Sequence, residues 1–184
     1  MLSLPNRKDS EGVPMKRASF LLFAVLFAAM LGLFPFGADC AYASGASTNS
    51  MYRMYNPNSG EHFYTADSYE RDHLVSVGWR YEGIGWVAPA TSGTPVYRLY
   101  NPNAGDHHYT TSAYERDHLV SVGWRYEGIG WCSDDAESVP VYRQYNPNAR
   151  AGAHNFTTDI YENDHLVSVG WREEGIGWYA VSAE

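Results

Sequence analysis

Lysine is absent from residue 44 to the C-terminus, because both lysines of the chain, Lys8 and Lys16, lie in its first segment. The same stretch has nine arginines against 18 aspartates and glutamates, so its formal charge is 9 − 18 = −9. A domain with this charge repels polyanionic partners. We therefore expect no binding to nucleic acid, teichoic acid or an acidic membrane surface.

Cysteine is also scarce, with only Cys40 and Cys132 in 184 residues. Cys40 falls in a predicted leader, so Cys132 would be the only cysteine of the exported part. A secreted domain with one cysteine has no internal disulfide, and we expect packing alone to hold it together.

The first 43 residues are typical of a secretory signal peptide with a polar N-terminal extension. A basic MKR at 15–17 precedes an apolar run at 20–34, which is too short to cross a bilayer comfortably, and AYA at 41–43 is a small-x-small cleavage signal. A lipoprotein would instead use Cys40, but Asp39 stands where a small residue is usual. We expect a secreted or cell-surface protein with no membrane contact after cleavage.

A Ser/Gly/Ala-rich spacer at 44–50 leads into three tandem repeats of about 45 residues, at 51–95, 96–140 and 141–184. The nonamer DHLVSVGWR begins at Asp72, Asp117 and Asp164, and the third repeat has two extra residues near Arg150. Three repeats without polar end caps favour closure about a pseudo-threefold axis. The sequence predicts one β-rich α+β domain at 51–184 that resembles a β-trefoil or a propeller.

Each repeat is predicted to form a hairpin, a short helix and then one or two strands. MYRMY at 51–55 alternates like a strand, NPNSG is a turn, and EHFYT at 61–65 is the second strand. Asp67 and Glu70 have the spacing of a capping box, and Gly78 ends the helix, which covers about 68–77. Tyr69, His73, Leu74 and Val77 fall on one side of it and are expected to face the core.

The repeat VYRLYNPNAGDHHYTTSAYERDHLVSVGWRYEGIGW at 96–131 resembles the tandem units of a family of exported bacterial proteins, catalogued as a domain of unknown function. The resemblance covers 51–184. It implies a non-catalytic accessory module, often appended to cell-wall hydrolases, with no established ligand. The third repeat departs from the pattern, since Asn155 replaces the Phe63/His108 position and Glu173 replaces Tyr81/Tyr126.

Aromatic residues give the main indication of function. From residue 44 onward the chain has six Trp, 14 Tyr and two Phe, more than a core of this size requires. Trp79, Trp124 and Trp171, at the helix exits, are expected to be the exposed platforms on which sugar rings stack. Trp86, Trp131 and Trp178, flanked by Ile and Gly, are expected to lie in the core; the alternative is the reverse assignment of the two sets. The full candidate ligand-binding set is Trp79, Trp124, Trp171, Tyr81, Tyr126, Asn58, Asn103, Asn148, His62, His107 and His154.

A zinc site and a catalytic site are the alternatives to sugar binding. Three equivalent histidines near a threefold axis can bind zinc, but no local ligand spacing supports this, and we expect no metal or cofactor. The repeated carboxylates at Glu82, Glu127 and Glu174 would give three identical sites if catalytic. Arg53, Arg98 and Arg143 are simpler partners for them, as structural ion pairs.

These observations predict an exported, non-catalytic module that binds carbohydrate, either a cell-wall polysaccharide or peptidoglycan. The alternative is a protein-binding or structural module that contacts other surface proteins. A glycoside hydrolase is the least favoured hypothesis, because its two carboxyl groups need different environments and three like repeats would supply identical ones.

Overall fold

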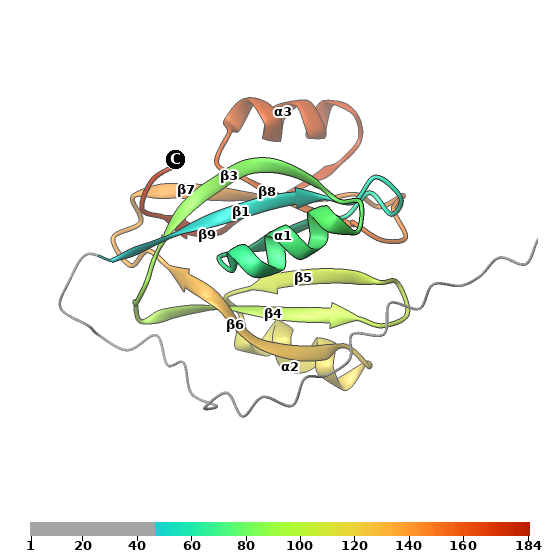
Figure 1. The fold of residues 1–184 in the computed structure, drawn as a ribbon, viewed down its shortest axis with the longest axis horizontal. Coiled ribbons are helices and arrows are strands. Elements are labelled where there is room, and N and C mark those ends of the chain that lie inside the picture. Colours follow the sequence, from blue (N-terminus) through green and yellow to red (C-terminus); the bar gives the residue numbers. More distant parts are fainter. Residues whose placement is uncertain (1–46) are drawn as a thin grey trace, which may run out of the picture. The chain divides into compact units, whose positions relative to one another are not determined.

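The structure is a computed structural model that describes residues 47–184 (Figure 1). The predicted signal peptide and the first residues of the spacer lie outside the described residues. No helix in the described part is long and apolar enough to cross a membrane.

Each repeat contributes three strands and one helix. Repeat 1 forms β1 (Thr48–Tyr55), β2 (His62–Thr65), α1 (Ser68–Ser76) and β3 (Arg80–Pro89). Repeat 2 forms β4 (Thr94–Asn101), β5 (Asp106–Thr110), α2 (Ala113–Ser121) and β6 (Arg125–Ser133). Repeat 3 forms β7 (Val139–Tyr145), β8 (His154–Thr157), α3 (Ile160–Ser168) and β9 (Arg172–Ala180). Strand β1 thus starts within the predicted spacer, and a single long strand follows each helix.

The strands form three separate antiparallel sheets, ordered β2-β1-β3, β5-β4-β6 and β8-β7-β9. Each sheet comes from one repeat, and each helix packs over the sheet of its own repeat (Figure 1). The predicted β-rich fold with three equivalent units is confirmed in these terms, and a threefold arrangement fits it.

Local chemistry explains where each helix ends. Gly78 has a φ of 101°, a conformation that glycine adopts without steric cost. The Trp79 amide donates to the Leu74 carbonyl at 3.0 Å, and the Gly78 amide donates to the Val75 carbonyl at 3.1 Å. This pair of bonds is a Schellman motif, as the position of Gly78 predicted.

The predicted N-caps are confirmed, but the capping box is wrong. The Asp67 carboxylate accepts from the Tyr69 amide at 2.8 Å, while the Asp67 amide donates to the Thr65 hydroxyl at 3.0 Å instead of to Glu70. Glu70 is drawn away by Arg98 of the next repeat, at 3.0 Å. An ion pair with a guanidinium outcompetes the reciprocal cap, which a threonine can replace.

The expected core-facing stripe of the helix is also wrong. Helix α1 buries no residue, and Tyr69, His73 and Val77 are exposed. The half-buried side of the helix carries Glu70, Arg71 and Leu74 instead. A marginal nine-residue helix is therefore held by its caps and by polar contacts to the strands, not by an apolar stripe.

The core is built from aromatic residues of all three repeats. Trp86, Trp131 and Trp178 are buried, and their ring centroids lie 5.2–5.6 Å apart. Tyr64, Tyr109 and Phe156 pack on this triad and contact one another at 5.7–6.0 Å. The prediction that this Trp set forms the core is confirmed. Cys132 is disulfide-bonded in the full-length chain, and the expectation that the exported part, without Cys40, has no internal disulfide stays a prediction.

Tyrosine hydroxyls link the second strands of different repeats. The Tyr64 hydroxyl donates to the Phe156 carbonyl at 2.9 Å and accepts from the Phe156 amide at 3.0 Å. The Tyr109 hydroxyl makes the same two bonds to the backbone of Tyr64, at 3.4 and 3.2 Å. Phe156 has no hydroxyl, so this series stops in repeat 3.

We expect Tyr64→Phe to lower the free energy of unfolding by about 1–3 kcal/mol, because it leaves a buried amide and carbonyl without their side-chain partner. Tyr109→Phe is the matched control and should cost less, since its two bonds are longer. Urea unfolding of both variants checks this. A Tyr64→Phe protein as stable as the parent would contradict it.

Candidate functional site

An arginine on the first strand of each repeat joins that repeat to its neighbour. Arg53 contacts Glu82 of its own sheet at 2.9 Å and Glu162 of α3 at 2.6 Å. Arg98 likewise bridges Glu127 at 3.1 Å and Glu70 of α1 at 3.0 Å. Arg143 bridges Glu174 at 2.7 Å and Glu115 of α2 at 3.0 Å.

These contacts form a cycle through all three repeats and are the structural ion pairs that the sequence predicted. Burial opposes ionisation of Glu162, but the hydrogen bond and charge of Arg53, together with Thr157 and His62, outweigh burial and lower its pKa. The pKa of Glu115 falls well below its usual range for the same reason, with His108 and Arg143 as its partners. These glutamates are thus held ionised by partners from two repeats, as expected of structural ion pairs.

The three second-strand histidines lie within this network, each beside the glutamate of its own sheet. The Nε2 atoms of His62 and His154 lie 3.4 and 3.2 Å from Glu82 and Glu174, each in its own repeat. His107 lies between Glu127, at 3.5 Å, and the buried Glu61 of repeat 1, at 2.6 Å. Among the described residues, no group of His, Cys, Asp and Glu has the arrangement of a metal site.

His107 and His154 occupy equivalent positions, but their pKa values are shifted in opposite directions. Burial alone would lower the pKa of His107, but hydrogen bonds to Glu127 and Glu61 raise it to about 9. Burial lowers the pKa of His154 to about 3, helped by His108, whose ring centroid is 4.5 Å away, and by Arg143. Burial also raises the pKa of Glu61, although His107 opposes this shift. We assign the pair as ionised, because one Glu61 oxygen accepts from both the ring and the amide of His107.

These pKa shifts predict that the free energy of unfolding falls on both sides of neutral pH, along an alkaline limb due to His107 and an acid limb due to His154. A raised histidine pKa stabilises the fold below the unfolded value of 6.5, and the contribution is lost as pH rises through about 9. The lowered pKa of His154 has the opposite sign, so its contribution is lost as pH falls from 6.5 toward 3. Each effect amounts to at most about 3–5 kcal/mol.

We therefore expect His107→Gln to flatten the alkaline limb of unfolding free energy against pH, and His154→Gln to flatten the acid limb. Urea titrations from pH 4 to pH 10 measure both slopes, and each variant is the control for the other. Unchanged slopes in both variants would contradict the assignment.

A surface cluster, which we call the Tyr–Arg–Asp cluster, forms in repeats 1 and 2. In repeat 1 the Arg71 guanidinium lies 4.4 Å from the Tyr52 ring centroid and 5.6 Å from that of Tyr81, and its Nε donates to Asp72 at 2.7 Å. In repeat 2 the cluster consists of Tyr97, Arg116, Asp117 and Tyr126, with the same three distances. Tyr81 and Tyr126 are 44% and 41% exposed. Helix and sheet thus present a repeated aromatic surface that bears one cation and one anion.

Repeat 3 has lost this cluster. Asn163 replaces the arginine and is buried, where it accepts from the amide of the buried Gln144 at 2.8 Å. Asn155 joins the same polar network by donating to Gln144 at 3.0 Å. Glu173 stands where the other repeats have Tyr81 and Tyr126. The third repeat therefore has a buried amide network in place of an exposed aromatic surface.

The structure places the remaining predicted residues in different surroundings. Trp79, Trp124 and Trp171 are half-buried, and Trp79 and Trp124 have their edges against Phe63 and His108. Asn58, Asn103 and Asn148 are exposed at the turn tips, and their amides donate to the preceding turn asparagines. Of the predicted set, only Tyr81 and Tyr126 belong to the Tyr–Arg–Asp cluster.

The sequence analysis missed the other members of the cluster, Tyr52, Arg71 and Asp72 in repeat 1. The sequence does contain a signal for them, because two positions of the cluster change together. YERD in repeats 1 and 2 becomes YEND in repeat 3, and the same repeat has Glu173 in place of Tyr81/Tyr126. It likewise missed three tyrosines in the first helical turns. Tyr69, Tyr114 and Tyr161 are 80–84% exposed, so they have no packing role in the described domain.

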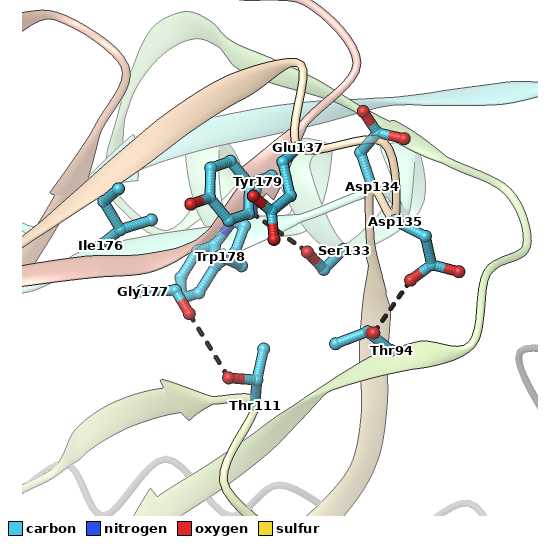
Figure 2. Close-up of a pocket in the computed structure, with 10 residues that line it drawn as sticks. All are labelled: Thr94, Thr111, Ser133, Asp134, Asp135, Glu137, Ile176, Gly177, Trp178 and Tyr179. Carbon is cyan, nitrogen blue, oxygen red and sulfur yellow. Dashed lines mark hydrogen bonds between the residues drawn. The ribbon is translucent and has the colours of Figure 1, made fainter.

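A polar pocket of about 320 Å³ lies beside the loop that follows β6 (Figure 2). It is lined by Thr94, Thr111, Ser133, Asp134, Asp135, Glu137, Ile176, Gly177, Trp178 and Tyr179. Asp135 accepts from the Thr94 hydroxyl at 2.9 Å and from the Gly93 amide at 2.7 Å, and Asp134 accepts from the Ala136 and Ser138 amides. Both aspartates therefore bond the loop itself. We take the Tyr–Arg–Asp cluster, and not this pocket, as the candidate site.

The model of a family described as a domain of unknown function (DUF5648) matches residues 50–181. The comparisons with curated proteins and with solved structures gave no match.

Proposed function

The chain belongs to this family of unknown function, and we propose that it is an exported, non-catalytic module that binds carbohydrate. The observation that carries the proposal is the Tyr–Arg–Asp cluster, which repeats at the same distances in two repeats. The exposed face of a tyrosine ring can stack on the apolar face of a pyranose, while neighbouring polar groups bond its hydroxyls. The partner we propose is a cell-wall polysaccharide or peptidoglycan.

The finer fold is part of the same proposal. We take the three repeats as propeller-like blades and not as a β-trefoil, because each sheet is drawn from one repeat. The cycle of ion pairs from Arg53 through Arg98 to Arg143 supports closure. A rigid body of this kind would hold two weak sites at a fixed separation, which raises avidity for a polymer by ~10² when both sites engage.

Absence of catalysis is proposed from how the carboxylates are used. Glu82, Glu127 and Glu174 each bond the arginine of their own sheet. A glycosidase needs two carboxyl groups in different environments, one kept protonated near neutral pH. Since the pKa values of Glu82 and Glu127 are lowered by their partners, neither is suited to be the acid.

A second candidate function, protein binding, is favoured by the helix tyrosines. Tyr69, Tyr114 and Tyr161 are almost fully exposed in equivalent positions. Tyrosine is enriched where proteins meet, because it combines a large apolar area with a hydroxyl. A Tyr69→Ser/Tyr114→Ser/Tyr161→Ser protein that keeps its glycan binding but loses a protein partner would favour this function.

We expect Tyr81→Ala/Tyr126→Ala to weaken carbohydrate binding about tenfold, since each ring offers roughly 50 Å² of apolar contact to a sugar. Glu173→Ala is the matched control at the equivalent position of repeat 3 and should leave binding unchanged. A glycan array and a peptidoglycan pull-down with the full chain measure it. If the parent protein binds neither probe, the proposed function is wrong.

A further inference from the structure

We propose that the Tyr–Arg–Asp cluster selects uncharged sugars that carry two neighbouring hydroxyls, and that two such sites work in the domain. This inference rests on the proposed function and names the ligand class for the same site: of the two proposed partners it favours an uncharged polysaccharide over peptidoglycan, whose peptides carry carboxylates. Three features of the cluster carry it: the arginine Nη donors that no carboxylate takes up, the second carboxylate oxygen of the aspartate, and their zero net charge.

The Arg71 guanidinium is held in place without its donors being used up by carboxylates. Its Nε is bonded to Asp72, and its face rests on the Tyr52 ring. Among the described residues, no carboxylate accepts from either Nη nitrogen of Arg71. Arg53, by contrast, uses Nε, Nη1 and Nη2 on Glu82 and Glu162. A preorganised fork with free N–H groups is a donor that loses little entropy when a ligand binds.

Asp72 supplies the complementary acceptor. One of its oxygens accepts from Arg71, while its side chain is 68% exposed, so the other oxygen faces solvent. The hydrogen bond to Arg71 lowers the pKa of Asp72 and keeps it ionised. A hydroxyl can both accept from Arg71 and donate to another group, so two adjacent hydroxyls match this donor and acceptor pair.

The charge of the cluster decides between uncharged and acidic sugars. Arg71 and Asp72 cancel, and the domain around them has a formal charge of −9 from residue 44 onward. A carboxylated or sulfated glycan would meet Asp72 next to its only cationic contact and would be repelled by the domain as a whole. An uncharged pyranose is repelled neither by Asp72 nor by the net charge of the domain, and its apolar face can rest on Tyr81.

Repeat 3 limits the number of sites to two. Asn163 is buried and bonded to Gln144, so it offers no donor to a ligand, and Glu173 removes the ring. Asp164 remains in place and accepts from Asn163 at 3.2 Å. Repeat 3 therefore provides a control residue with the same acidic side chain and no proposed ligand.

The test uses the full chain with two sets of probes. The uncharged set is cellohexaose, mannohexaose and maltohexaose, whose units carry hydroxyls on neighbouring carbons, and the acidic set is polygalacturonate, alginate and hyaluronan. We expect at least one uncharged oligosaccharide to bind, the acidic probes to bind about tenfold more weakly or not at all, and the uncharged binding to change less than about twofold between 50 and 500 mM salt. Calorimetry measures all three.

The variants locate the binding. Asp72→Asn/Asp117→Asn should weaken binding of the uncharged sugar about tenfold, because a carboxylate acceptor is lost at both sites. Asp164→Asn should leave it unchanged. Both substitutions lie on exposed or solvent-facing positions, and thermal melts show whether each protein is folded.

The outcomes separate the two proposals. Binding confined to acidic probes and weakened by salt would overturn this inference while leaving carbohydrate binding intact. Equal weakening by Asp164→Asn and Asp72→Asn/Asp117→Asn would also overturn it, because the site would then not be the cluster. Binding to none of the probes, on the array or in solution, would overturn the proposed function itself.

Discussion

Each repeat contains a half-buried arginine whose N–H donors are not all satisfied by the glutamate of its own sheet, and the arrangement of the domain depends on how the remaining donors are bonded. A half-buried guanidinium with a single carboxylate would leave donors without partners, which is costly in a poorly solvated place. Arg53, Arg98 and Arg143 each take a second carboxylate from the first helical turn of a neighbouring repeat. Because the first repeat is served by the third, the three contacts form a cycle. The charges thereby fix which repeats are neighbours, while the aromatic core supplies most of the burial.

The need of each arginine for a second carboxylate also explains why the helices lack a buried apolar stripe. A short helix usually survives in a protein by burying an apolar stripe. Here the glutamate in the first turn is given to the neighbouring arginine, and its capping role passes to a threonine hydroxyl on the second strand. The helix then stays on its sheet through Leu74, Arg71 and the Schellman motif. Its outer face is left free of packing duties, and that is where Tyr69 and Asp72 are exposed to solvent.

Much of this fold could be predicted from the sequence, and the failures have a common cause. The strands, the N-cap at Asp67 and the helix end at Gly78 depend on local chemistry, which a single repeat displays. The Trp86 set could be assigned to the core because glycine and isoleucine flank it. The apolar stripe on the helix and the capping box were wrong because Glu70 and Arg71 find partners that are distant in sequence or on another strand. The candidate site was found only in part for the same reason, since Tyr52 and Arg71 meet through the tertiary fold.

Repeat 3 shows which parts of a repeat serve the fold and which are spare. It keeps Arg143, the ion-pairing glutamates Glu162 and Glu174, the buried Trp178 and the helix caps, which hold it to its own sheet and to its neighbours. It has changed Phe63/His108 to Asn155, Arg71/Arg116 to Asn163 and Tyr81/Tyr126 to Glu173. Asn155 and Asn163 are compensated inside the repeat by Gln144, which turns an apolar contact into an amide network. Asn155 also accepts from the Tyr64 hydroxyl of repeat 1. The changes at Asn163 and Glu173 lie at positions of the Tyr–Arg–Asp cluster, whose ring and ion-pair contacts stay within one repeat. Because repeat 3 lacks the Tyr–Arg–Asp cluster and still packs like the others, repeats 1 and 2 do not need the cluster in order to fold. Its presence in both of them fits the proposed role in binding.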